Sequence, residues 1–143
     1  MPEALRALSP KLVALLEPRE EILEAYVFGS TATGSATAHS DVDLAVYLAD
    51  EPPASQFGYA ADLASAVMRT LETNAVDVIV LNRATPLVYH RVLRDGVRIL
   101  SRDLRATTTR EGRALSRYCD YVPQLAKIDA VHRGRTAAAR FGR

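Results

Sequence analysis

Two aspartates separated by one residue stand at the start of a predicted strand. Asp41 and Asp43 open the apolar run that ends at Leu48. Carboxylates at positions i and i+2 of a strand project from the same face of the sheet. Oxygen ligands placed in this way can share one or two hard cations such as Mg²⁺. The pair therefore predicts a cation site at one end of this strand.

A third acid, Asp77, interrupts the most strand-like run of the chain, residues 75–81. A continuous apolar run is typical of a central strand covered on both faces, so an acid is unexpected there. If the helix between the two strands places them side by side, Asp77 joins Asp41 and Asp43. Three unpaired buried carboxylates repel one another and lose hydration, which a divalent cation offsets. Two such cations can clamp an in-line displacement at phosphorus.

A glycine and a serine provide the complementary half of the predicted site. The strand predicted over residues 25–28 ends at Gly29 and Ser30, ten residues before Asp41. Backbone N–H groups, the serine hydroxyl and the start of a short helix suit a triphosphate. The lysine of a Walker A loop is missing, and Val46 stands where an EF-hand loop needs glycine. Carboxylates for metal beside a turn for phosphate predict nucleotidyl transfer.

Alternating and helical patterns of apolar residues predict an α/β fold with a central mixed sheet of about four strands flanked by helices. Strands are expected at residues 25–28, 42–48, 75–81 and 97–100. Helices are expected after Ser9-Pro10, as a short turn within 31–40, and over 54–73, 86–94 and 102–122, with Pro123 as a break and weaker helical character over 124–139.

Length and composition fit one domain spanning residues 1–143, with a helical C-terminal part from about residue 102 and a tail, 132–143, expected to fray. The chain is 48% hydrophobic and 24% charged, and no window approaches the ~18 apolar residues of a membrane span. The N-terminus has no basic segment followed by an apolar one, so we expect no signal peptide. The single cysteine, Cys119, fits a reducing, cytoplasmic location and provides no zinc framework.

The net charge of +1 conceals a strong asymmetry along the chain. Residues 1–81 carry 4 basic and 12 acidic residues, whereas residues 82–143 carry 14 basic and 5 acidic ones. The basic half can be a face for phosphate or nucleic acid, an interface with the acidic half, or arginines scattered over solvated helices. The sequence leaves these three readings open.

The joint pattern resembles the nucleotidyltransferases of the DNA polymerase β superfamily, and within it the minimal nucleotidyltransferase (MNT) group. Gly29-Ser30, a ten-residue spacer and Asp41-Val42-Asp43 match the signature Gly-Ser-x10-Asp-x-Asp of that group, and the resemblance covers about residues 20–105. It implies a polymerase β-like nucleotidyltransferase fold, two Mg²⁺ ions and ATP as a substrate. For MNT antitoxins it further implies transfer of AMP to a tyrosine of a cognate HEPN-type ribonuclease toxin, which neutralises the toxin.

The resemblance also implies a role for each site residue. Gly29 and Ser30 would hold the β- and γ-phosphates, and Asp41 and Asp43 the metals. Asp77 would ligate the second ion and help to deprotonate the attacking hydroxyl. Many relatives carry a basic residue where this chain has Thr33. In place of that basic residue, the triphosphate could be neutralised by Arg69, Arg83 or Arg91.

Two rival functions remain open, a small-molecule nucleotidyltransferase of the aminoglycoside-modifying kind and an antitoxin that acts by binding alone. The expected partners are the HEPN-type toxin and ATP, with no membrane and no direct nucleic-acid binding. Several residues have ordinary readings beside functional ones. His39 is expected in a loop, His90 in the core or its rim, Tyr118 and Tyr121 in helix packing or an interface, and Tyr47 in core packing or against a base.

Overall fold

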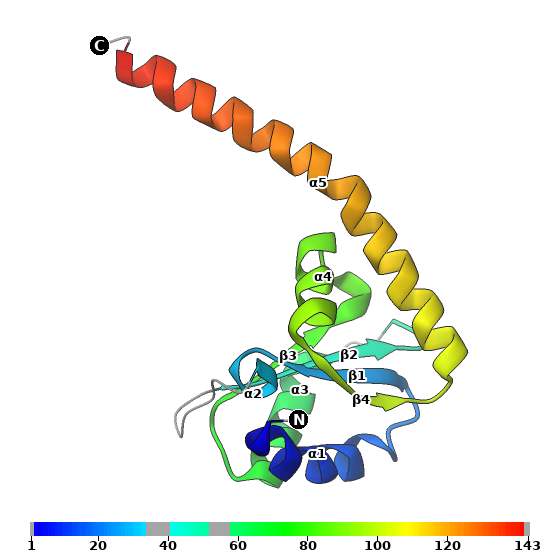
Figure 1. The fold of residues 1–143 in the computed structure, drawn as a ribbon. Coiled ribbons are helices and arrows are strands. Elements are labelled where there is room, and N and C mark those ends of the chain that lie inside the picture. Colours follow the sequence, from blue (N-terminus) through cyan, green and yellow to red (C-terminus); the bar gives the residue numbers. More distant parts are fainter. Residues whose placement is uncertain (1, 34–40, 52–57, 142–143) are drawn as a thin grey trace.

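The computed structural model describes residues 2–33, 41–51 and 58–141, drawn as a ribbon in Figure 1. The strands are β1 (Ile22–Phe28), β2 (Val42–Leu48), β3 (Val76–Val80) and β4 (Val97–Ser101). The helices are α1 (Glu3–Leu16), the four-residue α2 (Ser30–Thr33), α3 (Tyr59–Leu71), the 3-10 helix η1 (Leu81–Arg83), α4 (Pro86–Asp95) and α5 (Leu104–Phe141). The short helical turn predicted after Gly29 is α2, and residues 34–40 of its expected range lie outside the described part.

The strands form one mixed sheet in the order β3-β2-β1-β4. β1 pairs antiparallel with β2 and with β4, whereas β2 and β3 are parallel and joined through α3. This confirms the predicted four-stranded mixed sheet. β3, however, is an edge strand, so its prediction as a central strand was wrong. Its apolar run reflects what covers its two faces: α3 packs on one of them, and on the other Ile79 joins the apolar cluster that includes Tyr89 of α4 and Ala114 of α5.

Helices cover the two faces of the sheet separately, with α1 and α3 on one face and α4 and α5 on the other (Figure 1). Alternation along the strands divides the apolar side chains accordingly. The α1/α3 face buries residues such as Ala25, Val27 and Leu44. The α4/α5 face buries Tyr26 and Ala45. Because Asp43 alternates in phase with Ala45, the predicted site belongs to the α4/α5 face.

The N-terminal part of α1 shows why the start of this helix was predicted too late. Ser9-Pro10 was taken for the beginning of this helix, but Pro10 lies inside it. Leu5, a full turn and more before Pro10, is completely buried against the sheet. This burial outweighs the loss of one backbone N–H donor at the proline.

The first turns of α5 are tied to the body of the protein by polar contacts. The guanidinium of Arg102, just before α5, donates to four carbonyl oxygens from the last residue of α1 to the first residue of β1. Further along, the Tyr118 ring stacks on His90 of α4, with ring centroids 3.6 Å apart and planes 3° from parallel. The packing interpretations of these two residues therefore agree with the structure.

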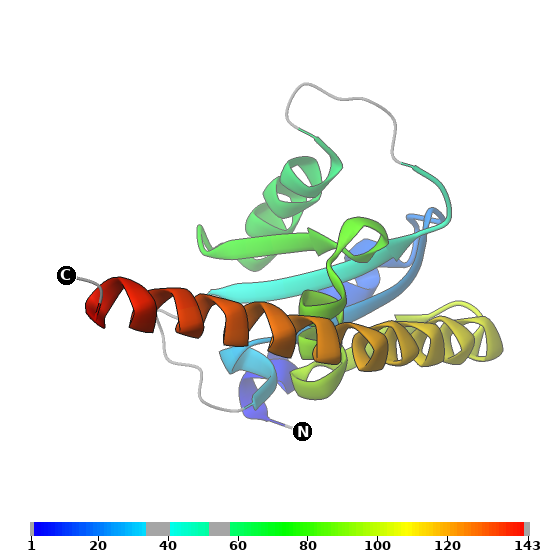
Figure 2. The same ribbon diagram turned by 90° about the horizontal axis from the view of Figure 1, so that it is seen from above.

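Beyond these contacts α5 continues as a single helix that projects away from the sheet (Figures 1 and 2). The predicted break at Pro123 was wrong, because Pro123 lies inside the helix. A proline removes one hydrogen bond and crowds the preceding turn, which bends a helix without necessarily ending it. Figure 1 shows α5 changing direction part-way along its length. Fraying of the tail in solution stays a prediction.

Candidate active site

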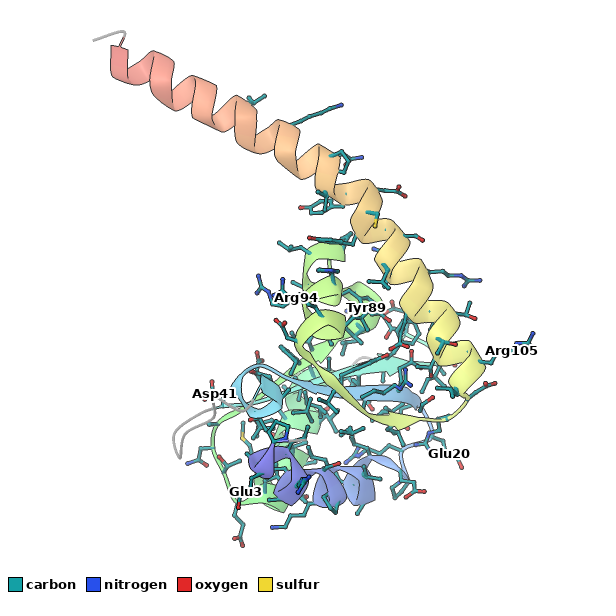
Figure 3. The ribbon with its side chains drawn as sticks, in the orientation of Figure 1. Glu3, Glu20, Asp41, Tyr89, Arg94 and Arg105 are labelled. Carbon is teal, nitrogen blue, oxygen red and sulfur yellow. The ribbon has the colours of Figure 1, made fainter. Side chains whose placement is uncertain are left out.

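The three predicted carboxylates lie together at one edge of the α4/α5 face. In the parallel pair of β2 and β3, Asp43 is the register partner of Asp77. Neighbouring strands are about 4.8 Å apart, so these two side chains start from adjacent positions on the same face. Asp41 precedes Asp43 by two residues and shares this face. Figure 3 shows Asp41 beside α2, remote from Arg105 at the start of α5.

The carboxylates interact through space and differ in exposure. Asp43 is half-buried, whereas Asp41 and Asp77 are exposed, which corrects the expectation of three buried acids. Asp77 is exposed because β3 is an edge strand. Burial raises the pKa of the Asp43 carboxyl, and the charges of Asp77 and then Asp41 raise it further. Asp43 is therefore the centre of a local excess of negative charge.

Gly29 lies directly against this carboxylate. It follows β1 and has a φ of +74°, a left-handed conformation that glycine adopts without strain. A Cβ atom at this position would overlap Oδ2 of Asp43 and lie 3.2 Å from its Cγ. The absence of a side chain thus allows the backbone at the start of α2 to approach the acids. The backbone of Ser30 begins α2, and its side chain lies outside what the structure describes.

The arginines considered for the triphosphate occupy different parts of the fold. Arg69 belongs to α3, which covers the opposite face of the sheet. Arg83 forms an exposed ion pair with Glu51. Arg91 is exposed on α4, which packs on the face that carries the acids. Of the three, Arg91 alone lies on the same face as the acids and takes part in none of the four ion pairs between described residues, although its charge helps to lower the pKa of Asp95. His39 and the side chain of Thr33 lie outside the described part.

Sequence reasoning missed a buried acid on the same face. Glu24 of β1 lies just before the strand expected at residues 25–28, and it is fully buried. Its carboxylate accepts two hydrogen bonds from Arg110 of α5, at 2.7 and 2.6 Å, and one from the hydroxyl of Thr107 at 3.0 Å. Alternation with Tyr26 places Glu24 among inward-facing positions, but its partner lies 86 residues away in the sequence. No local pattern reveals such a pair.

A divalent cation fits the three acids on the grounds of charge. Each of the four ion pairs between described residues involves another acid: Glu51, Asp95, Glu111 or Glu24. Within residues 2–33, 41–51 and 58–141, no group of three or more His, Cys, Asp or Glu side chains is arranged to hold a metal ion by itself. Mg²⁺ does not require one, because it is commonly held by one or two carboxylates together with substrate phosphates and water. Asp41, Asp43 and Asp77 could therefore contribute ligands to a metal ion brought with a nucleotide.

The charge excess predicts a pH-dependent effect on stability in the absence of metal. Because the pKa of folded Asp43 is above its unfolded value of about 3.8, the folded state binds more protons between these two values. Stability therefore falls as the pH rises through this window, and the full penalty applies at neutral pH. Asp43→Asn should stabilise the protein at pH 7 in EDTA, and the gain should disappear below the unfolded pKa. Urea denaturation across this pH range measures it.

Asp62→Asn is the control for this substitution, because Asp62 is an exposed acid in the first turn of α3, away from the three acids. It should not stabilise the protein at pH 7. Equal or lower stability of Asp43→Asn than of the wild type at pH 7 would contradict the account of mutual repulsion.

Comparison with known families matches residues 10–105 to the model for polymerase beta, nucleotidyltransferase. The matched range contains Gly29, Asp41, Asp43 and Asp77, and it covers more than half of the chain. The chain belongs to the polymerase beta nucleotidyltransferase family. The family resemblance drawn from the sequence is thereby confirmed, as is the nucleotidyltransferase fold.

Solved structures include similar members of this family. A chain of a toxin–antitoxin crystallised with AMP-PNP superposes with a TM-score of 0.74 at 24% identity, over 87% of this chain and 98% of that chain. A chain from the structure of a tri-AMPylated HEPN toxin from Shewanella oneidensis in complex with an MNT antitoxin superposes with a TM-score of 0.68 at 22% identity, over 89% of this chain and 98% of that chain. A protein assigned as a minimal nucleotidyltransferase superposes with a TM-score of 0.52 at 31% identity, over 68% of this chain and 95% of that chain. The first two show a shared fold.

No match is found among curated proteins. No helix among the described residues of this nucleotidyltransferase is long and apolar enough to cross a membrane.

Proposed function

We propose that this nucleotidyltransferase is an antitoxin that transfers AMP from ATP to a tyrosine hydroxyl of a HEPN-type ribonuclease toxin and thereby neutralises it. The observation that carries the proposal is the meeting of Gly29 with the coupled carboxylates of Asp41, Asp43 and Asp77. A phosphate-binding turn in contact with metal-binding acids is what nucleotidyl transfer requires. Two structures of similar fold, an MNT antitoxin in complex with a tri-AMPylated HEPN toxin and a toxin–antitoxin with AMP-PNP, support the choice of acceptor and nucleotide.

The reaction forms one bond and breaks one bond at the α-phosphorus of ATP. The tyrosine oxygen attacks this phosphorus, the bond to the oxygen that bridges to the β-phosphorus breaks, and pyrophosphate leaves. Asp41 and Asp43 would hold Mg²⁺, which supplies neutralisation of charge on the phosphates. Asp77, exposed at the edge of the sheet, would accept the proton of the attacking hydroxyl. Arg91 is the proposed residue for balancing the remaining phosphate charge.

The acceptor is tested by co-expression with the partner that co-purifies, followed by mass spectrometry of that partner. Wild-type protein should leave AMP on a tyrosine, and Asp41→Asn with Asp43→Asn should leave none. If the double variant silences the partner and AMP never appears on it, binding alone is the better account. If AMP appears on an aminoglycoside and never on the partner, the enzyme modifies small molecules.

An exposed apolar pair on α5 is a candidate contact with this partner. Leu115 and Val122 are 44% and 39% exposed. They are seven residues apart, which places them on the same face of the helix. Leu115→Glu with Val122→Glu should weaken partner binding by at least about 1 kcal/mol, because buried apolar anchors dominate interface energies. Calorimetric titration of the partner measures the change.

Leu104→Glu is the matched control for this pair. Leu104 is 59% exposed at the first residue of the same helix, so the substitution adds one of the pair's two negative charges at another accessible apolar site. It should leave partner affinity unchanged. Equal loss of affinity in both variants would point to a general effect of charge on the basic half of the chain.

A further inference from the structure

A small pocket lies between β2, α4 and α5 on the sheet face that carries the acids. It has a volume of about 150 Å³. Tyr47 and Tyr89 line it from the sheet and from α4, and Arg110, Arg113 and Arg117 line it from α5, together with Ala114. Figure 3 shows Tyr89 between α4 and α5. These residues define what we call the Tyr89 pocket.

The hydroxyl of Tyr89 is a buried donor with no partner in the described structure. The residue is 3% exposed, and among the described residues its hydroxyl oxygen is the buried side-chain atom left without a hydrogen bond. Burial raises the pKa of this hydroxyl, so it stays protonated at neutral pH. A buried donor with no acceptor is costly, and native proteins rarely leave one unsatisfied. An acceptor inside the pocket would remove this cost.

The charge of the pocket is positive. Arg110 is neutralised by its two hydrogen bonds to Glu24, and its guanidinium also lies 5.0 Å from the centre of the Tyr47 ring. Arg113 and Arg117 have no ion-pair partner within the described ranges. They are four residues apart, so they extend from the same face of α5. The side chains that line the pocket are therefore hydrogen-bond donors and cations, and the two acids whose charges act on Tyr89 are already paired, Glu24 with Arg110 and Glu111 with Arg98.

The pocket is separate from the three carboxylates. Tyr47 follows Asp43 by four residues on β2, which corresponds to about 13 Å along an extended strand. A volume of this size is smaller than the roughly 300 Å³ or more of typical small-molecule sites, so it does not fit a whole nucleotide. It is nevertheless room for several water molecules at about 30 Å³ each, and hence for a single carboxylate or phosphate group.

We propose that the Tyr89 pocket binds a compact oxyanion, a carboxylate or a phosphate group, which accepts a hydrogen bond from Tyr89 and pairs with Arg113 and Arg117. Its source is either a free phosphate species or an acidic side chain of a bound protein. Both have the same recognition chemistry, namely acceptor oxygens and negative charge. The site is independent of the proposed transfer reaction.

The test follows the tyrosine ring carbons that bear the hydroxyls by NMR while inorganic phosphate is added in EDTA at constant ionic strength. The chain has six tyrosines, and Tyr89→Phe identifies the signal of Tyr89 by its loss. The Tyr89 signal should shift and saturate. Arg113→Gln with Arg117→Gln should lower the apparent affinity at least about tenfold, because two charge-assisted hydrogen bonds are removed. No saturable shift at Tyr89, or an unchanged affinity in the double variant, would overturn the proposal.

Two controls separate this pocket from other effects. Arg69→Gln removes an exposed arginine on the opposite face of the sheet and should leave the affinity unchanged. Asp41→Asn with Asp43→Asn should also leave it unchanged, so a failed transfer reaction and a failed anion site are distinguishable. Thermal stability is an additional readout: phosphate should raise the melting temperature of the wild type more than that of Tyr89→Phe, which lacks the hydroxyl group.

Titrations with acetate and with pyrophosphate distinguish the two sources of the anion. If acetate binds the Tyr89 pocket as well as phosphate does, the pocket is suited to a protein carboxylate. If phosphate or pyrophosphate binds more tightly by about tenfold or more, a free phosphate species is the better occupant.

Discussion

Gly29→Ala should reduce nucleotidyl transfer at least about a hundredfold while the protein stays folded. The new Cβ would overlap Oδ2 of Asp43, so the carboxylate and the turn before α2 cannot both keep their positions. Displacing reacting groups by about 1 Å can cost this much in rate. Initial rates of AMP transfer at saturating ATP measure the effect, and circular dichroism confirms that the variant is folded.

Gly58→Ala separates this effect from backbone strain. Gly58 also has a left-handed φ, +87°, but a Cβ there would meet nothing within 4 Å. Both variants should lose about 1–2 kcal/mol of stability from the strained conformation, and only Gly29→Ala should lose transfer. If both retain activity, contact between Gly29 and Asp43 is not needed for catalysis.

Glu24→Ala should be the most destabilising of the substitutions considered, by about 3 kcal/mol or more. It leaves the Arg110 guanidinium, whose side chain is 21% exposed, without its carboxylate, and the buried Thr107 hydroxyl keeps only its hydrogen bond with Ser101. Removing one member of a buried ion pair commonly has such a cost, because the remaining charge is left unpaired. The free energy of unfolding from urea titration measures the loss. The loss should be accompanied by weakened packing of α5.

Two comparisons sharpen this prediction. Glu51→Ala breaks the fully exposed pair with Arg83 and should leave stability essentially unchanged. Glu24→Met with Arg110→Met replaces both charges by apolar groups and should cost less than Glu24→Ala alone. Glu24→Ala with a stability equal to that of Glu51→Ala would show that the buried pair does not hold α5 in place.

The meeting of Asp43 with Asp77 was predictable because it depends mainly on local patterns. Alternation along each strand placed the acids of β2 on one face, and the connecting helix implied neighbouring strands. The left-handed turn at Gly29 has an equally local signature, since glycine avoids strain there. These features do not depend on where the remaining strands lie.

Strand order and helix length depend on contacts distant in sequence, and there the predictions failed. The run around Asp77 is apolar on both faces whether β3 lies at the centre or at an edge covered by helices. A local rule excludes proline from helix interiors, yet Pro10 and Pro123 both lie inside helices, because packing and bending override the rule. The roles of Glu24 and Tyr89 depend on their contacts with α5, and no sequence pattern near these two residues predicts where α5 lies.

ATP radiolabelled at either the α- or the γ-phosphate provides the most direct measurement of the central claim. Incubation with Mg²⁺ and the co-purifying partner should place α-label on the partner and release γ-label as pyrophosphate. Asp41→Asn with Asp43→Asn should abolish both. Transfer of γ-label to the partner, or equal labelling by the double variant, would contradict nucleotidyl transfer at these carboxylates.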